Sequence, residues 1–218
     1  MLIKKSKNQK ILISSGPVWV PIDRVRVMTN VFGGALGYVM AEVATQAGFD
    51  VTLVMGPGRV KFSGQEKFKL IKFKYYDEVY KILEEEIQSR KYDVMIHSAA
   101  IPDYLPKEEK SGKIKSGKDE LVIKFKPTKK IVDEMKKWDP DIFLVKFKLE
   151  VNKAREELID IAHKSMMHSN ADLMVANDLN DVLGTHKAFI IDRDKNIQEF
   201  IGKEEIAKNL IAEIQKQI

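Results

Sequence analysis

The stretch ILISSGPVWVPIDRVRVMTNVFGGALG, residues 11–37, decides the fold of this chain. It opens with a short apolar run that ends in Ser14-Ser15-Gly16-Pro17, the pattern of a buried parallel strand stopped by a turn. Gly34 and Gly37 lead into an amphipathic segment closed by Gly48, which predicts a helix with a glycine after its last turn. A strand, a Gly-bearing turn and a helix form the first half of a βαβ unit, whose helix N-terminus can hold a phosphate.

The connection between this strand and this helix is unusually long. A nucleotide-binding turn normally takes a few residues, whereas residues 17–33 intervene here and carry Asp23, Arg24, Arg26 and Asn30. A compact domain seldom keeps so long a loop without a use for it. We therefore expect the loop to supply functional side chains.

Composition restricts the class of protein. With 218 residues and 44% hydrophobic content, the chain can bury one sizeable core, and we expect a single domain over residues 1–218. The absence of Cys excludes a disulfide scaffold and a Cys nucleophile, and it suits a reducing cytoplasm. No apolar run approaches the ~20 residues of a membrane span. The 37 Lys and Arg are interspersed with 32 Asp and Glu, which is typical of a solvated surface and not of a nucleic-acid-binding face.

Strands and helices alternate along the rest of the chain. After the first helix, the pattern predicts strands at 50–57, 68–74 and 94–98 around a helix at 76–90. This rhythm favours an α/β, Rossmann-like, doubly wound and mainly parallel sheet. The elements expected beyond it are a strand at 141–151, a helix at 155–170, a strand at 171–181, a hairpin at 187–200 and a closing helix at 203–218.

The segment 107–127 breaks this rhythm. Its first part is rich in Lys, Gly and Ser, and residues 121–125 then alternate between the two faces of a strand. We predict a mobile basic loop followed by a projecting strand or hairpin over 119–126, and a helix that starts at Pro127-Thr128 and runs to 138. A projecting strand exposes an unpaired edge, so a homodimer contact is the economical way to cover it.

Polar or small residues follow several of the predicted strands. Because the carboxyl ends of parallel strands meet at one edge of a sheet, these residues are expected to converge there, with loop 16–30 covering them. They are Ser14-Ser15-Gly16, Gly56, Ser98-Ala99-Ala100 with Asp103, Phe147-Lys148 and Asn177-Asp178.

Four segments carry a resemblance to a known family: the loop and helix start within 14–37, residues 98–115, 145–150 and 175–178. In the first, Pro21-Ile22-Asp23, Val25-Arg26, Thr29-Asn30, Gly34 and Gly37 stand in register with the motif of the phosphopantothenate–cysteine ligases of coenzyme A biosynthesis. The later segments, which contain Asp103-Tyr104, Lys113-Ile114-Lys115, Phe147-Lys148 and Ala176-Asn177-Asp178, resemble further motifs of that family. The pattern over 142–178 looks closest to its short, monofunctional bacterial branch.

The resemblance implies an enzyme that joins 4′-phosphopantothenate and L-cysteine through an acyl-nucleotidylate. It implies CTP as co-substrate with Mg²⁺, although the sequence does not decide CTP against ATP, and a separate phosphopantothenoylcysteine decarboxylase as the next enzyme. By the same resemblance Asn30 would hold the acyl phosphate, Arg26 the substrate end and Lys113 the triphosphate or pyrophosphate. The nucleotide, with Asp103 also near Mg²⁺, would be bound by Ser15, Gly16, Gly34, Ala99, Ala100, Asp103, Phe147, Lys148, Asn177 and Asp178.

The chain departs from the family pattern at five positions. Val18 and Val20 stand where Thr and Glu are usual, and Phe32-Gly33 stands where the family has a Ser pair that could contact phosphate. Lys146 replaces a Gly, so its side chain could crowd or recharge the wall near the base.

Other functions fit parts of the sequence. A nicotinamide-dependent dehydrogenase of the short-chain type shares the Gly-rich strand–helix start, but none of the six Tyr is followed by Lys four residues later. A non-catalytic nucleotide- or RNA-binding module explains the basic loop and leaves Asp103 and Asn177-Asp178 without a role. Asn30 could also merely cap the helix. His97 reads as structural, and the spacing of His163 and His168 does not favour a zinc site.

Overall fold

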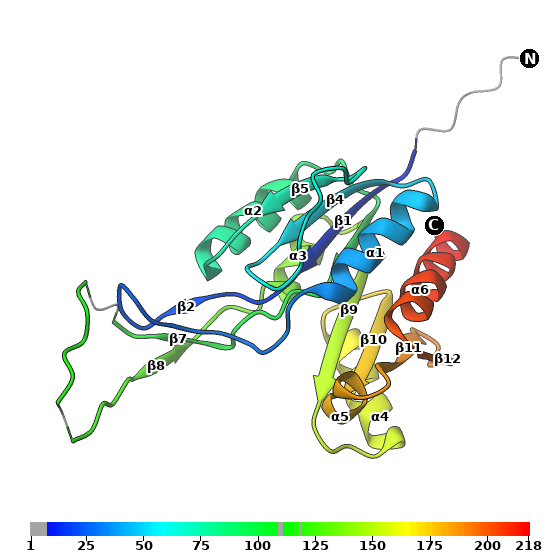
Figure 1. The fold of residues 1–218 in the computed structure, drawn as a ribbon. Coiled ribbons are helices and arrows are strands. Elements are labelled where there is room, and N and C mark those ends of the chain that lie inside the picture. The colour runs from blue at the N-terminus through cyan, green and yellow to red at the C-terminus, as the bar shows by residue number, and fades with distance from the viewer. Residues whose placement is uncertain (1–7, 109–110, 118) are drawn as a thin grey trace, which may run out of the picture.

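The computed structural model describes residues 8–108, 111–117 and 119–218. Its centre is an eight-stranded sheet in the order β12-β11-β10-β9-β6-β1-β4-β5 (Figure 1). The strands from β10 to β5 in this order are parallel, and β11 and β12 add an antiparallel edge. They are β1 (Lys10–Ser15), β4 (Asp50–Met55), β5 (Lys69–Lys72), β6 (Val94–His97), β9 (Phe143–Glu150), β10 (Leu173–Asp178), β11 (Lys187–Asp192) and β12 (Ile197–Ile201).

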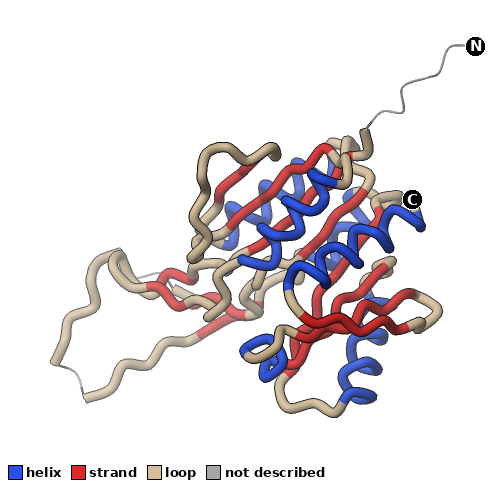
Figure 2. Tube along the Cα trace, turned by 45° about the vertical axis from the view of Figure 1, so that its right-hand side comes forward, coloured by secondary structure: helices blue, strands red, loops and turns tan. Residues whose placement is uncertain are grey.

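Helices cover both faces of the sheet, as Figure 2 shows. One face packs against α1 (Ala35–Gln46) and α6 (Lys203–Gln217), and the other against α2 (Tyr76–Gln88), α3 (Val132–Trp138) and α4 (Arg155–His168). A short helix, α5 (Leu179–Leu183), follows β10 directly. The predicted α/β fold with a mainly parallel sheet is confirmed. Among the described residues, no helix is long and apolar enough to cross a membrane.

Two small ribbons project from the sheet and form an arm. The hairpin β2 (Val20–Pro21) and β3 (Val27–Met28) lies in the long loop after β1, and β7 (Tyr104–Pro106) pairs with β8 (Phe125–Pro127). We call residues 20–28 and the described part of 104–127 the arm. Figure 1 shows β2 running outward beside β7.

Three sequence predictions in this region need correction. The loop after β1 covers the sheet edge only at its two ends, where Pro17 and Asn30 both contact Ala100, while β2 and β3 between them pair with each other and extend along the arm. The projecting strand is shorter than expected, since β8 begins at Phe125. The helix predicted from Pro127-Thr128 begins at Val132, because Pro127 belongs to β8 and Thr128 donates hydrogen bonds back to the carbonyls of Asp103 and Pro102.

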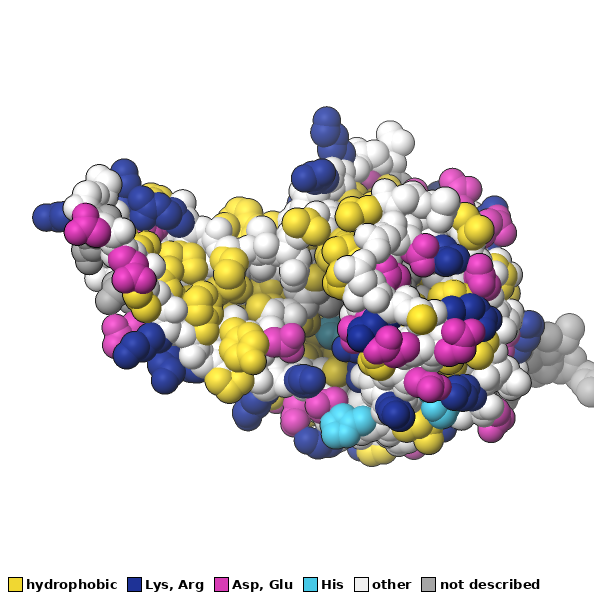
Figure 3. Space-filling view, turned by 90° about the horizontal axis from the view of Figure 1, so that it is seen from below, with side chains coloured by type: hydrophobic (Ala, Val, Ile, Leu, Met, Phe, Trp, Pro, Cys, Tyr) yellow, Lys and Arg dark blue, Asp and Glu magenta, His cyan; other side chains and the backbone are white. Residues whose placement is uncertain are grey.

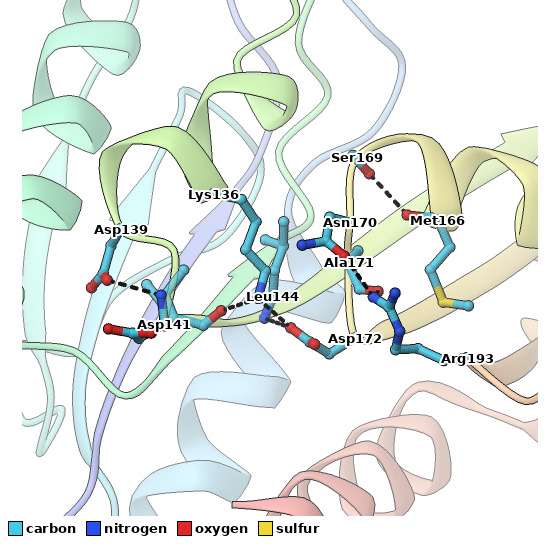
Figure 4. A network of polar contacts seen from close by, with 11 residues as sticks. Lys136, Asp139, Asp141, Leu144, Met166, Ser169, Asn170, Ala171, Asp172 and Arg193 are labelled. Carbon is cyan, nitrogen blue, oxygen red and sulfur yellow. Dashed lines mark hydrogen bonds and ion pairs between the residues drawn. The ribbon is translucent and has the colours of Figure 1, made fainter.

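The amino ends of β9 and β10 are fixed by a network of polar contacts (Figure 4). Asp172 accepts hydrogen bonds from the Leu144 amide, at 2.7 Å, and pairs with the Lys136 ammonium at 2.8 Å. The Arg193 guanidinium donates to the side chain of Asn170 and to the carbonyl of Ala171. These contacts join α3, both strands and the β11–β12 turn at the edge opposite to the strands' carboxyl ends.

A row of buried polar side chains crosses the other end of the sheet. Ser14, His97 and Lys146 are register partners on β1, β6 and β9, so all three side chains point to the same face. The hydroxyl of Ser14 lies 2.7 Å from Nδ1 of His97. Lys146 extends toward α4 and donates to the Ser165 carbonyl, at 2.9 Å, and to the Ser169 hydroxyl, at 3.0 Å. The Lys146 ammonium is therefore hydrogen-bonded at the C-terminal end of α4.

Burial changes the protonation of this row. It lowers the pKa of His97 to about 4, and the charge of Lys146 acts in the same direction. Burial also lowers the pKa of Lys146 to about 8, although the carboxylate of Asp133 opposes that shift. At neutral pH the imidazole is consequently neutral and serves as a hydrogen-bonding partner of Ser14, the structural role predicted for His97.

We predict that His97 makes stability fall in acid. Its folded pKa of about 4 lies below its ordinary 6.5, so the unfolded state binds more protons between these values. The contribution is fully present above pH 6.5 and is lost as pH falls toward 4, by about 3 kcal/mol at 1.36 kcal/mol per pKa unit. The measurement is the free energy of unfolding against pH for the wild type and His97→Asn. The difference in unfolding free energy between wild type and His97→Asn should become smaller as pH falls from 6.5 to 4. Parallel curves over this pH range would contradict the prediction.

Candidate active site

The sheet has its topological switch point beside β1. From β1 the chain passes to β4 and β5 on one side, and then to β6, β9 and β10 on the other. The backbone carbonyl of Ser14 accepts from the amide of Ser98, at 3.0 Å, and from its hydroxyl, at 2.9 Å. The carbonyl of Gly16 accepts from the amide of Ala100 at 3.0 Å. The loops after β1 and β6 therefore lie side by side, where open parallel sheets bind ligands.

The turn into α1 is built from glycines that pack tightly against β1. Gly34 is the N-cap residue of α1 with φ of +80°, a conformation that L side chains rarely adopt. A Cβ on Gly37 would lie 2.0 Å from the hydroxyl of Ser15, so the first turn of α1 rests directly on the end of β1. Among the described residues, no side chain caps this helix and its first turn carries no acid. Its backbone amides can therefore receive an anion.

Asn30 lies where the loops after β1 and β6 meet beside the start of α1, a place called the crevice below, and it does not cap the helix. Gly34 occupies the N-cap position, so the capping alternative for Asn30 is wrong. The exposed side chain of Asn30 donates from Nδ2 to the carbonyl of Ala100, at 3.2 Å. Thr29 beside it donates to the carbonyl of Val18 at 3.0 Å, which closes the base of the β2–β3 hairpin. The motif loop and the β6 loop are thereby joined at the predicted nucleotide site.

Arg26 and Lys113 lie on the arm and are connected through Asp23. The Arg26 guanidinium pairs with the buried Asp23 carboxylate at 2.7 Å. The same carboxylate accepts from the amide of Ile114, the neighbour of the exposed Lys113, at 3.0 Å. The sequence placed Asp23 in the motif without giving it a role, because nothing in a single sequence links it to a residue 91 positions away.

Asp103 stands exposed at the root of the arm, immediately before β7. Its backbone carbonyl accepts from the Thr128 amide at 2.9 Å, which fixes the position of the residue. Among the described residues, no group of three or more His, Cys, Asp or Glu could hold a metal ion. A single exposed carboxylate fits Mg²⁺ that is bound mainly by substrate phosphates and water, as this ion commonly is.

The Phe147-Lys148 pair divides between the two faces of the sheet. Phe147 is half-buried and packs with the apolar cluster under α1 and α6. Lys148 lies on the opposite face and pairs with Glu150 at 2.9 Å. Lys146 also lies on that face and is held by α4, so it does not crowd the wall near Phe147.

The side chains of Asn177 and Asp178 are buried and bonded within the protein. Asn177 donates to the carbonyl of Lys187 at 3.0 Å. Asp178 accepts from the amides of Asn180, at 3.0 Å, and Lys153, at 2.9 Å, and these bonds lower its pKa. Both residues hold the carboxyl end of β10 in place, so they shape the edge of the site through the backbone.

Fold and site define a class of protein: a Rossmann-like α/β domain with a glycine-built strand-to-helix turn at the switch point of the sheet and a projecting arm that follows it. Residues 6–218 match the family model described as the DNA/pantothenate metabolism flavoprotein C-terminal domain, and the chain belongs to this family.

Known relatives agree with this assignment. The chain is 33% identical, over 99% of its length, to the coenzyme A biosynthesis bifunctional protein CoaBC of Thermococcus kodakarensis, of which it covers 53%. It spans about half the length of the curated relatives that it matches. The crystal structure of the DNA/pantothenate metabolism flavoprotein from Streptococcus pneumoniae superposes with a TM-score of 0.87 and 31% identity, over 96% of this chain and 100% of that one. The C-terminal domain of a CoaBC protein gives 0.80 and 26%, over 97% and 96%.

Proposed function

We propose that this protein is a phosphopantothenate–cysteine ligase that uses CTP and Mg²⁺. The observation that carries the proposal is the hydrogen bond from Asn30 to Ala100, because it joins the motif loop to the crevice at the switch point. Arg26, on the same loop, is linked through Asp23 to the segment that carries Lys113. Membership of the family and the likeness to CoaBC proteins support the same activity.

The reaction has to form an amide from a carboxylate, which is a poor acyl donor until it is activated. A carboxylate oxygen of 4′-phosphopantothenate would attack the α-phosphorus of CTP, and the α–β phosphoanhydride bond would break to release pyrophosphate. The amine of cysteine would then attack the acyl carbon, CMP would leave and the amine would lose a proton to solvent. Both steps build negative charge on oxygen, which positioned amides and cations stabilise.

The chain offers suitable groups for each part of this reaction. The uncapped amides of α1 would receive phosphate oxygens, and Asn30 would hold the acyl phosphate. Arg26 would contact the phosphopantothenate end and Lys113 the triphosphate. Mg²⁺ beside Asp103 would neutralise phosphate charge when bound. Ser15, Gly16, Gly34, Ala99 and Ala100 would line the nucleotide site with small residues, and Phe147 lies on the α1 side of the sheet.

Ligase activity is tested directly with purified protein, 4′-phosphopantothenate, cysteine, Mg²⁺ and either CTP or ATP. We expect pyrophosphate release that requires phosphopantothenate and is faster with CTP. Tight binding of CTP without pyrophosphate release would favour a non-catalytic nucleotide-binding module. Tight binding of NADH would instead favour the dehydrogenase, and either outcome would refute the ligase.

Asn30→Asp should lower turnover while the fold is retained. The substitution places a carboxylate beside bound phosphate and opposite the Ala100 carbonyl, and both contacts become repulsive. We expect a loss of about 10²–10³ in turnover, the usual effect of removing one preorganised electrostatic group, with only a small fall in the thermal midpoint because the side chain is exposed. Near-normal turnover would remove Asn30 from the catalytic residues.

We also propose that the protein is a homodimer joined through the arm. Val122 and Leu121 are 67% and 50% exposed, and neither lies in a described strand. Val25, Val27 and Tyr104 add further exposed apolar surface to the arm, and Figure 3 shows hydrophobic side chains gathered along it. Exposed apolar patches next to an incompletely paired strand commonly mark an interface.

Val122→Lys and Leu121→Asp should weaken this dimer because each places a charge in the apolar contact. We expect the dissociation constant to rise about tenfold or more, at 1.4 kcal/mol per factor of ten. The control is Ile201→Lys, since Ile201 is similarly exposed but lies on the edge strand β12. Sedimentation velocity at micromolar concentration measures the change. A monomeric wild type, or full activity in both arm variants, would contradict the proposed interface.

A further inference from the structure

The carboxylate of Asp23 joins two segments of the arm that are distant in sequence. Its side chain has no exposed surface although it lies in a loop. Oδ1 accepts from the amides of Val25, at 2.9 Å, and Arg26, at 2.8 Å, and so closes the turn between β2 and β3. Oδ2 accepts from the Arg26 guanidinium, at 2.7 Å, and from the amide of Ile114, at 3.0 Å. The two oxygens therefore serve different purposes.

Ile114 is held at both of its backbone polar groups. Its amide donates to Asp23, and its carbonyl accepts from the Arg26 guanidinium at 3.4 Å. Within the described residues 111–117, this is the point at which the backbone is bonded to the hairpin. The Cα of the exposed Lys113 is only one residue away, about 3.8 Å along the chain. Fixing Ile114 therefore restricts where the Lys113 side chain can reach.

We propose that Asp23 is a positioning residue for Lys113: by binding the amide of Ile114, it holds the basic segment of the arm against the loop that carries Arg26 and Asn30. This inference rests on the proposed ligase function and adds to it the group that places the lysine. Oδ1 closes the turn and the Oδ2–Arg26 pair also lies within the hairpin, so the bond of Oδ2 to Ile114 is the one that a stabilised hairpin alone does not explain.

The charge of Asp23 makes this contact persistent. The hydrogen bond from the Ile114 amide is the largest influence on the carboxyl group and, with those from Val25 and Arg26, it lowers the pKa of Asp23 below its ordinary 3.8 despite burial. The stabilisation is therefore present above pH 3.8 and is lost only as pH falls through the lower folded value. In the neutral range Asp23 stays ionised and the contact does not titrate.

The division between the two oxygens gives a selective variant. In Asp23→Asn the amide oxygen can keep the bonds to Val25 and Arg26, while the new NH₂ group opposes the donors of Ile114 and the guanidinium. We expect turnover to fall about 10–100-fold with little change in the KM for cysteine or in the thermal midpoint. Asp192→Asn is the matched control, because Asp192 accepts two bonds from Asn196 in the distant β11–β12 turn, and its activity should be unchanged.

A double-mutant cycle with Lys113→Ala separates positioning from a general loss of structure or an effect through Arg26. Alone, Lys113→Ala should cost about 10²–10³ in turnover. If Asp23 acts through Lys113, Asp23→Asn should reduce turnover less than about threefold further in the Lys113→Ala background. Additive effects would overturn the proposal. Should Asp23→Asn unfold the hairpin, Ile114→Pro removes the same amide donor from the other side and is used in the same cycle.

Amide hydrogen exchange tests the contact without using activity. Asp23→Asn should raise exchange about tenfold or more in residues 111–117 and leave residues 24–28 unchanged. Unchanged exchange at 111–117 would overturn the inference. A wild type without turnover would refute the ligase and with it the positioning role, even where exchange shows that the contact exists. An active wild type with additive substitutions would refute only the positioning role.

Discussion

The carboxyl end of β1 is the point on which the rest of this structure depends. Three successive residues there offer backbone carbonyls to later parts of the chain: Ser14 to the Ser98 amide, Ser15 to the Gly56 amide and Gly16 to the Ala100 amide. Buried backbone carbonyls need partners, so these bonds decide where the loops after β4 and β6 begin. The same residues are covered by the first turn of α1, which only a glycine at position 37 allows. The same contacts therefore hold the end of β1 in the sheet and position the loops of the candidate site.

Much of the fold followed from local patterns. Apolar runs and helical periodicity predicted the strands of the main sheet and the helices α1, α2, α4 and α6. These predictions succeed because the spacing of apolar residues within each segment indicates which of its faces is buried. The arm was predicted less well for the opposite reason. The alternation in residues 121–125 indicates a strand with one apolar face. It does not indicate which other strand, if any, this segment pairs with. In the structure β7 has three residues and pairs with 125–127, so the strand is short and α3 starts later than predicted.

The site shows the same limit at the level of single residues. Position in the chain placed the small residues after β1 and β6 correctly, since parallel strands share an edge. Chain position did not predict that the side chains of Asn177 and Asp178 form hydrogen bonds with backbone groups of the protein. It also did not predict that the Lys146 side chain points toward α4, on the face opposite to Phe147. Those outcomes depend on which face each side chain takes and on partners up to 25 residues away, such as Lys153 for Asp178. Spacing alone does not contain this information.

The distribution of charge also explains why an arm would be needed. The fixed part of the crevice offers neutral donors: backbone amides at the start of α1 and the amide of Asn30. Two lysines on β9 have partners within the protein: the buried Lys146 is hydrogen-bonded to α4, and Lys148 is paired with Glu150. A triphosphate bound there would therefore meet little full positive charge from the sheet itself. The two cations proposed to act on phosphate lie on the arm, where Asp23 fixes Arg26 directly and the neighbour of Lys113 through its amide. The buried carboxylate of Asp23 would then set the positions of both Arg26 and Lys113. Its negative charge is compensated by the four hydrogen bonds that it accepts, so it would repel bound phosphate less than a free carboxylate would.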